Sequence, residues 1–303
     1  MAEVSHFPTA LPDPEVDITI DMVATMLEGQ FPEYANQPLR LGSSGWDNVL
    51  VRIGDSLAAR LPRRELAARH AAVELDWLPA IGRAWHFSAP IPLAIGQPDA
   101  NAGYPWRWSV VPWLAGHVAL DAPLSVAGAA DLGEALAQVH APAPVDAPLN
   151  PVRSLPLPKR RDRFEHRLAM LEQDPTWRVD ATAAMAIFDA ADARDRLWWC
   201  HMDIHGNNIL TREGRLAGVL DWGDCGAGDP ATDLGQAWCL IGADLFAVLA
   251  DSYLSARGPA DPSAPRVKAE AVLYAATLAT LQENHYSASG WRALEALGVA
   301  HTT

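Results

Sequence analysis

The sequence HMDIHGNN occupies residues 201–208, and the sequence DWGD follows at residues 221–224. Asp203 stands five positions before Asn208, and Asp221 stands thirteen positions after Asn208. Kinase-type phosphoryl transfer needs a carboxylate that orients the attacking hydroxyl and accepts its proton, together with an amide and a second carboxylate that hold magnesium. The spacing therefore predicts Asp203 as the catalytic residue, and Asn208 and Asp221 as the ligands of Mg²⁺.

The segment between the two motifs predicts a short β-hairpin. Residues 209–211 are apolar or β-branched, residues 212–214 have the composition of a turn, and residues 216–220 are again largely apolar. A hairpin of this size would place Asn208 and Asp221 at the same open end. Magnesium prefers oxygen ligands and keeps several waters, so these two side chains and the phosphates of a nucleotide are enough to hold it.

These motifs, with GDPATD at residues 228–233, resemble the aminoglycoside/macrolide phosphotransferase family. GWDNV at 45–49 and RLPR at 60–63 look like its nucleotide-binding part, and the similarity extends over roughly residues 41–238. The resemblance implies an α+β, two-lobed, protein-kinase-like fold. Residues 1–112 would form a nucleotide-binding lobe with a small antiparallel sheet. Residues 113–303 would form a mostly helical lobe that carries the catalytic loop and the acceptor site.

The first lobe contains the expected nucleotide contacts. Residues 42–48 predict a loop over the triphosphate, because glycine and serine leave backbone N–H groups accessible. The loop residues expected to contact the nucleotide are Ser43, Ser44 and Gly45. Kinase architecture, and not the local sequence, predicts that the adenine binds beside the strand near residue 111. The contacts expected there are Val111, Trp113 and Leu114.

Arg60 is the candidate for the phosphate contact that kinases usually make with lysine. The chain has two lysines, Lys159 and Lys268, and neither lies in the first lobe. Glu74, on a predicted helix over residues 65–81, can turn inward and form the cation–glutamate pair that active kinases require. The alternatives are a solvated strand arginine and a surface glutamate. The apolar stripe predicted for this helix is Leu66, His70, Val73, Trp77 and Ile81.

The rest of the chain predicts a series of helices. Their expected ranges are 19–27, 125–140, 159–172, 181–199, 233–256 and 265–287, with Thr19 and a serine at 125 as caps. The apolar run at 238–254 contains two aspartates, which favours a buried helix over a membrane span. Asp224, beside the metal motif, and Glu283, at the end of the last helix, are candidate acceptor contacts. A solvated helix end is an equal alternative for Glu283.

Composition narrows the class of partner. The chain has 303 residues and a formal net charge of −14, which argues against nucleic acid or an anionic membrane as a partner. The charge would suit a cationic small substrate, although acidic compositions are common in soluble proteins. The three cysteines form no Cys-x-x-Cys pair and the first 17 residues resemble no secretory signal, so we expect a cytoplasmic protein. We expect a monomer or a weak dimer.

The predicted reaction transfers the γ-phosphoryl group of ATP or GTP, with Mg²⁺, to a hydroxyl of a small molecule. The resemblance favours an antibiotic such as an aminoglycoside or macrolide as that molecule. Three alternatives remain: a housekeeping metabolite kinase, an inactive nucleotide-binding relative, and a zinc hydrolase. Arg60 and Met202 support the inactive relative, because the family usually has lysine and glycine at these positions. Cys200, His201 and His205 suggest zinc, but the resemblance implies a structural role for His201.

Overall fold

A five-stranded antiparallel sheet forms the centre of the first part of the chain. The computed structural model describes residues 13–45, 47–194, 196–257 and 263–303. The strands of this sheet are β1 (Leu39–Ser44), β2 (Asn48–Ile53), β3 (Leu57–Pro62), β4 (Ala94–Gly96) and β5 (Trp108–Pro112). Their order is β1-β2-β3-β5-β4. Alternate residues of β2 are buried, because successive side chains of a strand point to opposite faces.

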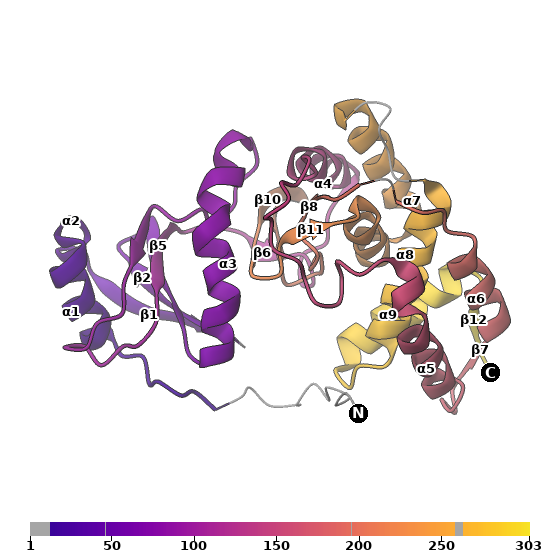
Figure 1. Ribbon diagram of the computed structural model, residues 1–303, viewed down its shortest axis with the longest axis horizontal. Helices are drawn as coiled ribbons and strands as arrows, with labels where there is room; N and C mark the ends of the chain where they lie inside the picture. Colours follow the sequence, from indigo (N-terminus) through magenta and orange to yellow (C-terminus); the bar gives the residue numbers. More distant parts are fainter. Residues whose placement is uncertain (1–12, 46, 195, 258–262) are drawn as a thin grey trace. The chain divides into compact units, whose positions relative to one another are not determined.

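Helices cover both faces of this sheet (Figure 1). Helices α1 (Ile20–Gln30) and α2 (Pro32–Ala35) lie on one side, and α3 (Glu65–Ile81), followed by the short η1 (Gly82–Ala84), lies on the other. Thr19 caps α1 as predicted, since its hydroxyl accepts the N–H of Met22 at 3.2 Å. The buried face of α1 packs with β2, β3 and β5 in one apolar core.

The buried face of α3 differs from the predicted one, although the bounds of the helix agree. The buried residues are Ala67, Ala71, Glu74, Leu75 and Leu78. Leu66, which we expected inside, is 52% exposed. The large apolar residues at helical spacing were misleading, because two alanines, Glu74 and two other leucines occupy the buried face instead. Glu74 consequently lies within the buried face and not beside it.

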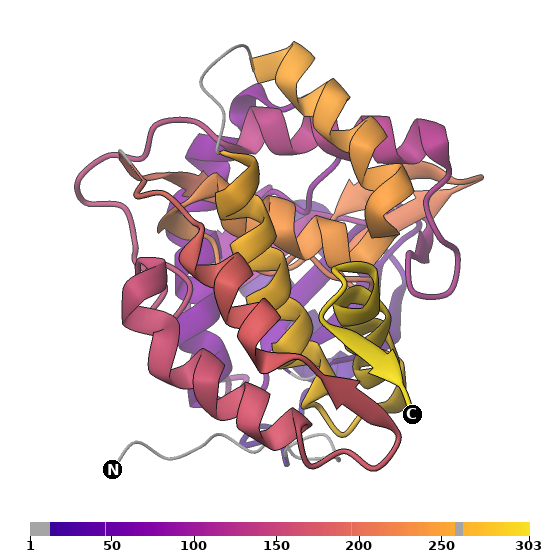
Figure 2. The same ribbon diagram turned by 90° about the vertical axis from the view of Figure 1, so that its right-hand side faces the viewer.

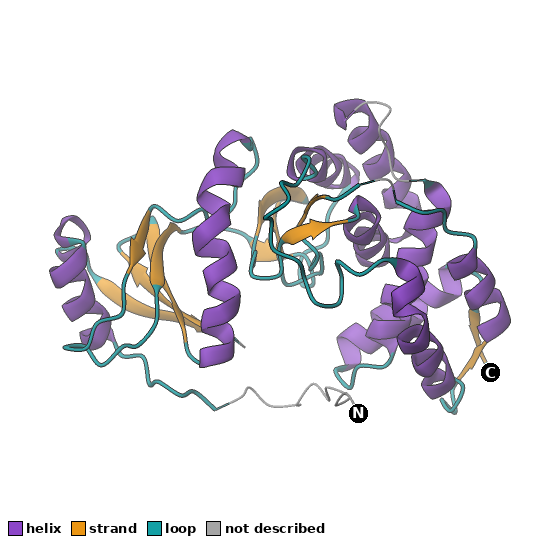
Figure 3. Cartoon of the chain, viewed as in Figure 1, coloured by secondary structure: helices purple, strands orange, loops and turns teal. Residues whose placement is uncertain are grey.

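The second part of the chain is mostly helical (Figure 3). Its helices are α4 (Val126–Val139), η2 (Leu157–Arg160), α5 (Arg161–Leu171), α6 (Ala181–Asp189), α7 (Pro230–Arg257), α8 (Ala264–Ala279) and α9 (Asn284–Ala296). Its short strands are β6 (His117–Val118), β7 (Trp177–Val179), β8 (Trp198–Cys200), β9 (Ile209–Arg212), β10 (Arg215–Val219), β11 (Gly226–Gly228) and β12 (Ala300–Thr302). They form the sheets β10-β9-β6, β11-β8 and β12-β7, so the predicted hairpin is present as β9 and β10.

The core of the helical part surrounds α8, which packs against α5, α6, α7 and α9 (Figure 2). Two helix predictions were wrong in extent. Helix α6 ends at Asp189, before the strand β8, and the range predicted as one helix over 265–287 is α8 followed by the start of α9. Glu283 therefore precedes α9 as its N-cap residue and does not end a helix.

Helix α7 is the one described helix that is long and apolar enough to cross a membrane, a property that core helices share. Its backbone leaves the helical conformation at Gly242, where φ is 78° and ψ is 170°. The buried residues run from Pro230 to Cys239, and after the break they are Leu249 and Tyr253. The apolar run at 238–254 is thus only partly buried, contrary to the expectation of a buried helix.

The described chain divides into two compact units. One contains residues 13–116 together with 217–224, and the other contains residues 117–216 and 225–303. The DWGD motif therefore belongs to the unit with the five-stranded sheet, and the HMDIHGNN motif belongs to the helical unit. The meeting of Asn208 and Asp221 across the two units stays a prediction.

Candidate active site

Asp203 lies in the loop between β8 and β9, and several donors surround its carboxylate. Its Oδ1 accepts a bond from Nη2 of Arg153 at 2.8 Å. Its Oδ2 accepts one from Nδ2 of Asn208 at 3.0 Å and lies 3.3 Å from Nε2 of His205. Its own N–H donates to Nδ1 of His201 at 3.1 Å, so His201 holds the loop from within, in the structural role that the resemblance implied.

Asp203 stays ionised in this setting. Burial raises the pKa of its carboxyl, but the charge of Arg153, the hydrogen bond and charge of His205 and the charge of His201 outweigh burial. The net effect is a pKa well below the usual range. A carboxylate has about four lone-pair positions, so a substrate hydroxyl can still be accommodated beside these three neighbours.

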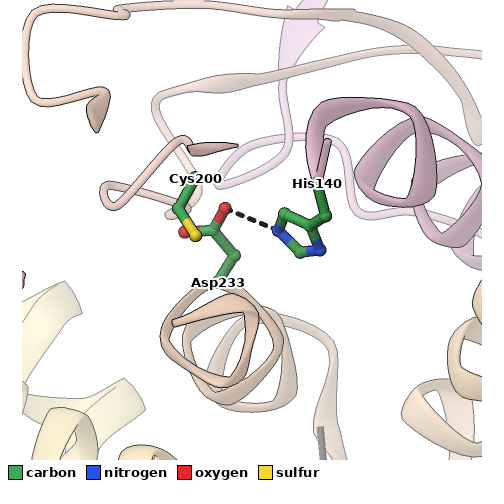
Figure 4. A group of neighbouring side chains, drawn as sticks. All are labelled: His140, Cys200 and Asp233. Atoms are coloured by element: carbon green, nitrogen blue, oxygen red, sulfur yellow. Dashed lines mark hydrogen bonds and ion pairs between the residues drawn. The ribbon is translucent and has the colours of Figure 1, made fainter. Parts of the chain in front are cut away.

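Asp233, at the start of α7, anchors the backbone of the loop that carries Asp203. Its Oδ2 accepts the N–H of His201 and its Oδ1 accepts the N–H of Met202, both at 2.7 Å. Figure 4 shows the same carboxylate bonded to His140, whose Nε2 lies 3.0 Å from Oδ2. Nδ1 of His140 is 2.9 Å from the hydroxyl of Tyr253. All of these groups are buried, so the loop rests on a satisfied polar network.

The same network places Cys200 with His140 and Asp233 in an arrangement that resembles a metal site (Figure 4). Zinc would need a thiolate, but burial raises the pKa of Cys200 well above its ordinary value and so favours the thiol. Both oxygens of Asp233 already accept backbone N–H groups. The hydrogen bonds of these groups therefore support a structural role for the cluster better than a zinc site.

Met202 adopts a backbone conformation that favours glycine. Its φ is 67°, in the left-handed region, although its side chain is fully buried. The Sδ atom accepts a weak bond from Oγ of Ser154 at 3.8 Å. A Cβ on Gly228 would come within 2.2 Å of the terminal methyl of Met202. The backbone at Met202 is therefore strained, and the strain is offset by burial of the side chain and by the hydrogen bond from its N–H to Asp233.

The two predicted metal ligands are presented in ways that suit magnesium. Asn208 is buried and uses its Nδ2 for the carbonyl and the carboxylate of Asp203, at 2.9 and 3.0 Å, which leaves its amide oxygen as the donor for a cation. Asp221 has a 48% exposed side chain and a left-handed φ of 57°. Each of the two donors is a hard oxygen of the kind that Mg²⁺ prefers, and a magnesium site shared by the two residues stays a prediction.

Arg60 and Glu74 form the pair that we expected, and the pair continues into the metal motif. Nη1 of Arg60 donates to Oε2 of Glu74, and Nη2 donates to Oδ1 of Asp221 at 3.0 Å. Oε1 of Glu74 accepts the N–H of Trp222 at 2.8 Å. Burial disfavours the charge on Arg60, but Glu74 and Asp221 outweigh it and raise the pKa of the guanidinium. Glu74 thus joins the guanidinium of Arg60 to the backbone of DWGD.

The expected triphosphate loop begins within β1. Ser43 and Ser44 end that strand, and their side chains lie outside the described residues. The N–H of Gly45 donates to the carbonyl of Asn48 at 2.9 Å. Asp47 connects the loop to α3, since Oδ1 accepts from Arg64 at 2.9 Å and Oδ2 lies 3.6 Å from Nδ1 of His70.

The charges of Asp224 and Asp221, in the DWGD motif, also act on the pKa of His70. The hydrogen bond that the His70 ring donates to Asp47 raises the pKa of His70, and the charges of Asp224 and Asp221 add to this rise against the effect of burial. Asp224, which we expected at the acceptor, thus lies within electrostatic reach of α3 and the triphosphate loop. Its assignment to the acceptor site stays a prediction.

The expected adenine contacts lie at the end of β5. Val111 is buried and pairs with Ala58 of β3. The N–H of Trp113 donates to the carbonyl of Ser56 at 2.8 Å, and its ring lies under the guanidinium of Arg52 at 4.1 Å. That N–H is therefore already engaged. Leu114 is half-buried, and its Cδ1 would lie 2.9 Å from a Cβ added at Gly218, so a side chain at residue 218 would displace it.

Two tyrosines of the helical unit extend the surroundings of Asp203. The hydroxyl of Tyr286 accepts from Nδ2 of Asn207 at 2.6 Å, and its ring packs edge-on against His205. Burial raises the pKa of Tyr274, and the charge of Asp203 adds to this rise. Glu283 acts on Tyr286 through its charge, so the predicted acceptor residue does lie in this neighbourhood.

Comparison with known proteins shows the family of this chain. The model of the phosphotransferase enzyme family matches residues 38–269, more than half of the chain. The chain belongs to the phosphotransferase enzyme family. This phosphotransferase is a small-molecule kinase that acts on an alcohol group, as the motifs predicted. None of the curated proteins compared with it matches.

Solved structures confirm the predicted kinase-like fold of this phosphotransferase. The GDP and kanamycin complex of APH(2")-IIia has a TM-score of 0.62 at 16% identity, over 91% of this chain and 98% of that one. Macrolide 2'-phosphotransferase MphH from Brachybacterium faecium has a TM-score of 0.56 at 21% identity, over 89% and 96%. The streptomycin–ATP complex of APH(2")-IIa has a TM-score of 0.56 at 17% identity, over 92% and 97%.

Arg153 is the residue of this phosphotransferase that sequence reasoning missed. It lies in the proline-rich connection between α4 and η2, between two of the predicted helices. One signal was present: Asn150, three positions earlier, is typical of a turn in which the asparagine side chain accepts backbone N–H groups. That signal predicts a turn, but it does not predict what the turn faces.

Proposed function

We propose that this phosphotransferase transfers the γ-phosphoryl group of ATP or GTP, with Mg²⁺, to a hydroxyl of a small molecule. The observation that carries the proposal is the setting of Asp203, which is ionised, held by Asn208 and His205, and fixed from below by Asp233. Asp203 orients the hydroxyl and takes up its proton. Positioning and charge neutralisation supply most of the rate enhancement in this chemistry.

Residues of the unit with the five-stranded sheet hold the nucleotide in this proposal, together with Asn208 of the helical unit. Arg60 contacts the phosphates with its charge, and Glu74 keeps the guanidinium in place. Asn208 and Asp221 hold Mg²⁺, which neutralises the phosphate oxygens. The loop at 42–48 covers the triphosphate. The similar solved structures with GDP, ADP or ATP support a nucleoside triphosphate as the co-substrate.

An antibiotic such as an aminoglycoside or macrolide is the first candidate for the acceptor, with antibiotic resistance as its consequence. The support is the likeness to structures described as aminoglycoside and macrolide phosphotransferases. A cellular metabolite as the acceptor stays the alternative prediction. A cytoplasmic location, a monomeric or weakly dimeric state and the absence of a membrane partner stay predictions.

The test is a coupled assay of nucleoside diphosphate release with Mg²⁺ and ATP or GTP. We expect slow release without acceptor, stimulation by an accepted compound, and a loss of at least about 10²-fold in Asp203→Ala. The matched control is Asp162→Ala, which removes an exposed carboxylate from α5 of the same unit. Release that is unchanged in Asp203→Ala would contradict the role of Asp203. Nucleotide binding without release by the wild-type protein would favour the inactive relative.

A further inference from the structure

The hydroxyl of Tyr286 carries a proton that the described part of the fold does not use. Nδ2 of Asn207 donates to this hydroxyl at 2.6 Å, so the phenol oxygen acts there as an acceptor. A phenol also has one O–H of its own to donate. No acceptor for that O–H is found among the residues that the structure describes. The hydroxyl of Tyr286 can therefore donate to a bound molecule.

Tyr286 keeps this proton and stays accessible to a ligand. Burial raises the pKa of its hydroxyl, and the charges of Asp203 and Glu283 add to the rise, against the effect of the bond from Asn207. The side chain is half-buried, so part of it faces solvent. A neutral phenol can bind a ligand without the cost of removing a charge from water.

One side chain separates Tyr286 from the carboxylate of Asp203. Nε2 of His205 lies 3.3 Å from Oδ2 of Asp203. The ring of Tyr286 packs edge-on against the ring of His205, with 5.8 Å between the ring centres and 86° between the planes. Nδ1 of His205 accepts the N–H of Asn207 at 3.2 Å, so the ring proton of neutral His205 lies on Nε2 and faces Asp203. All four residues belong to the helical unit.

A second oxygen of an acceptor fits this arrangement. Oxygens on neighbouring carbons lie about 3 Å apart, and each O–H···O hydrogen bond adds about 2.7–2.8 Å. An acceptor whose reacting hydroxyl lies on Asp203 therefore presents its next oxygen toward a neighbouring side chain. The phenol of Tyr286 donates to a hydroxyl or to an ether oxygen, and it carries no charge that would repel a charged substituent of the acceptor.

We propose that Tyr286 binds the acceptor through its O–H, which donates to an oxygen on the carbon next to the one that carries the reacting hydroxyl. The acceptor then binds at two points, with the reacting hydroxyl on Asp203 and the neighbouring oxygen on Tyr286. The substrate class is a molecule with oxygens on adjacent carbons, as in a sugar ring. This inference rests on the proposed kinase function and narrows its acceptor. The competing explanation is that Tyr286 only supports His205 and Asn207 within the fold.

The experiment compares three alcohols that differ in a second oxygen. In trans-1,2-cyclohexanediol this oxygen lies on the next carbon, in trans-1,3-cyclohexanediol it lies one carbon further away, and cyclohexanol lacks it. The value of kcat/KM for each alcohol comes from the acceptor-stimulated release of nucleoside diphosphate with Mg²⁺ and ATP or GTP. The variants are Tyr286→Phe and Tyr286→Leu. The control is Tyr34→Phe, which removes a phenol hydroxyl from α2 in the unit with the five-stranded sheet.

We expect the wild-type protein to prefer the 1,2-diol over the other two alcohols. Tyr286→Phe should remove this preference by lowering kcat/KM for the 1,2-diol on the order of three- to tenfold, the value of one hydrogen bond. The 1,3-diol and cyclohexanol should change less, because phenylalanine keeps the ring against His205. Tyr286→Leu removes the ring as well and should also lower kcat for all three alcohols, while Tyr34→Phe should keep the preference.

Three results would overturn the inference. The first is equal stimulation of the wild-type protein by the three alcohols, which includes stimulation by none of them. The second is a preference for the 1,2-diol that survives in Tyr286→Phe. The third is an equal loss for all three alcohols in Tyr286→Phe, which a purely structural role predicts. Failure of the kinase proposal gives a different result, because release of nucleoside diphosphate would then be unaffected by Asp203→Ala.

Discussion

Replacing Glu74 tests whether its pair with Arg60 stabilises the unit that contains the five-stranded sheet. The side chains of Arg60 and Glu74 are 14% and 6% exposed, so Glu74→Ala leaves a largely buried guanidinium that is still paired with Asp221. Removing one partner of a buried pair costs about 3–5 kcal/mol. The substitution also removes the acceptor of the N–H of Trp222, which costs about 1–3 kcal/mol.

The two contributions overlap, since both come from the same carboxylate, and Asp221 retains part of the charge compensation. We therefore expect Glu74→Ala to lower the free energy of unfolding by about 3–5 kcal/mol. Glu74→Gln keeps an oxygen for the N–H of Trp222 and should be destabilised by about 1–2 kcal/mol less. The surface pair of Asp76 with Arg107 is the control, and Asp76→Asn should lower stability by less than about 1 kcal/mol.

Urea unfolding followed by tryptophan fluorescence measures these differences. Hydrogen exchange of peptides from β3 and α3 shows whether the loss is confined to the unit that contains the pair. The reasoning would be refuted by a loss below about 1 kcal/mol in Glu74→Ala, because such a value is typical of an exposed pair. A loss as large in Asp76→Asn would also refute it, since burial would then not be the cause.

Three further predictions concern the catalytic loop and its anchor. Met202→Gly should be more stable than Met202→Ala by about 1 kcal/mol in thermal unfolding, because both variants lose the buried side chain and only glycine adopts the left-handed φ without strain. A more stable alanine variant would argue against backbone strain at residue 202. Burial lowers the pKa of His140, so the unfolded state takes up a proton before the folded state does, and the free energy of unfolding should fall as the pH drops below about 6.5. This dependence of stability on pH should be weaker in His140→Gln. An unchanged dependence would assign it to other groups. Removing Mg²⁺ with EDTA should abolish the release of nucleoside diphosphate. Asn208→Ala should raise the Mg²⁺ concentration that gives half-maximal activity at least about tenfold. An unchanged magnesium requirement would argue against Asn208 as a ligand.

Local sequence predicted the elements well where one chemical signal dominated. Thr19 and Ser125 cap their helices, as hydroxyl side chains at an N-terminus do. The apolar alternation in β2 became a half-buried strand. The prediction of the buried stripe of α3 was wrong, because the number of large apolar residues does not show which face of a helix packs against a sheet. Alanines and the buried Glu74 occupy that face.

The net charge of the chain does not describe the immediate surroundings of Asp203. A value of −14 predicted a cationic substrate, which stays a prediction, while Arg153 and two histidines lie beside Asp203. Long-range fields depend on the sum of all charges, but recognition depends on the few groups within hydrogen-bond distance. The charges that matter here come from segments about 50 residues apart in the sequence.

The sequence alone determined the family, the kinase-like fold and the chemical type of each group, because Asp203, Asn208 and Asp221 are spaced as phosphoryl transfer requires. Only the tertiary structure decided the partners of those groups. Asp233 holds the loop, Glu74 joins Arg60 to the backbone of Trp222, and the turn at residues 150–154 delivers Arg153 to Asp203. The physical reason is that spacing constrains neighbours along the chain, while hydrogen bonds and charges act between segments that folding brings together.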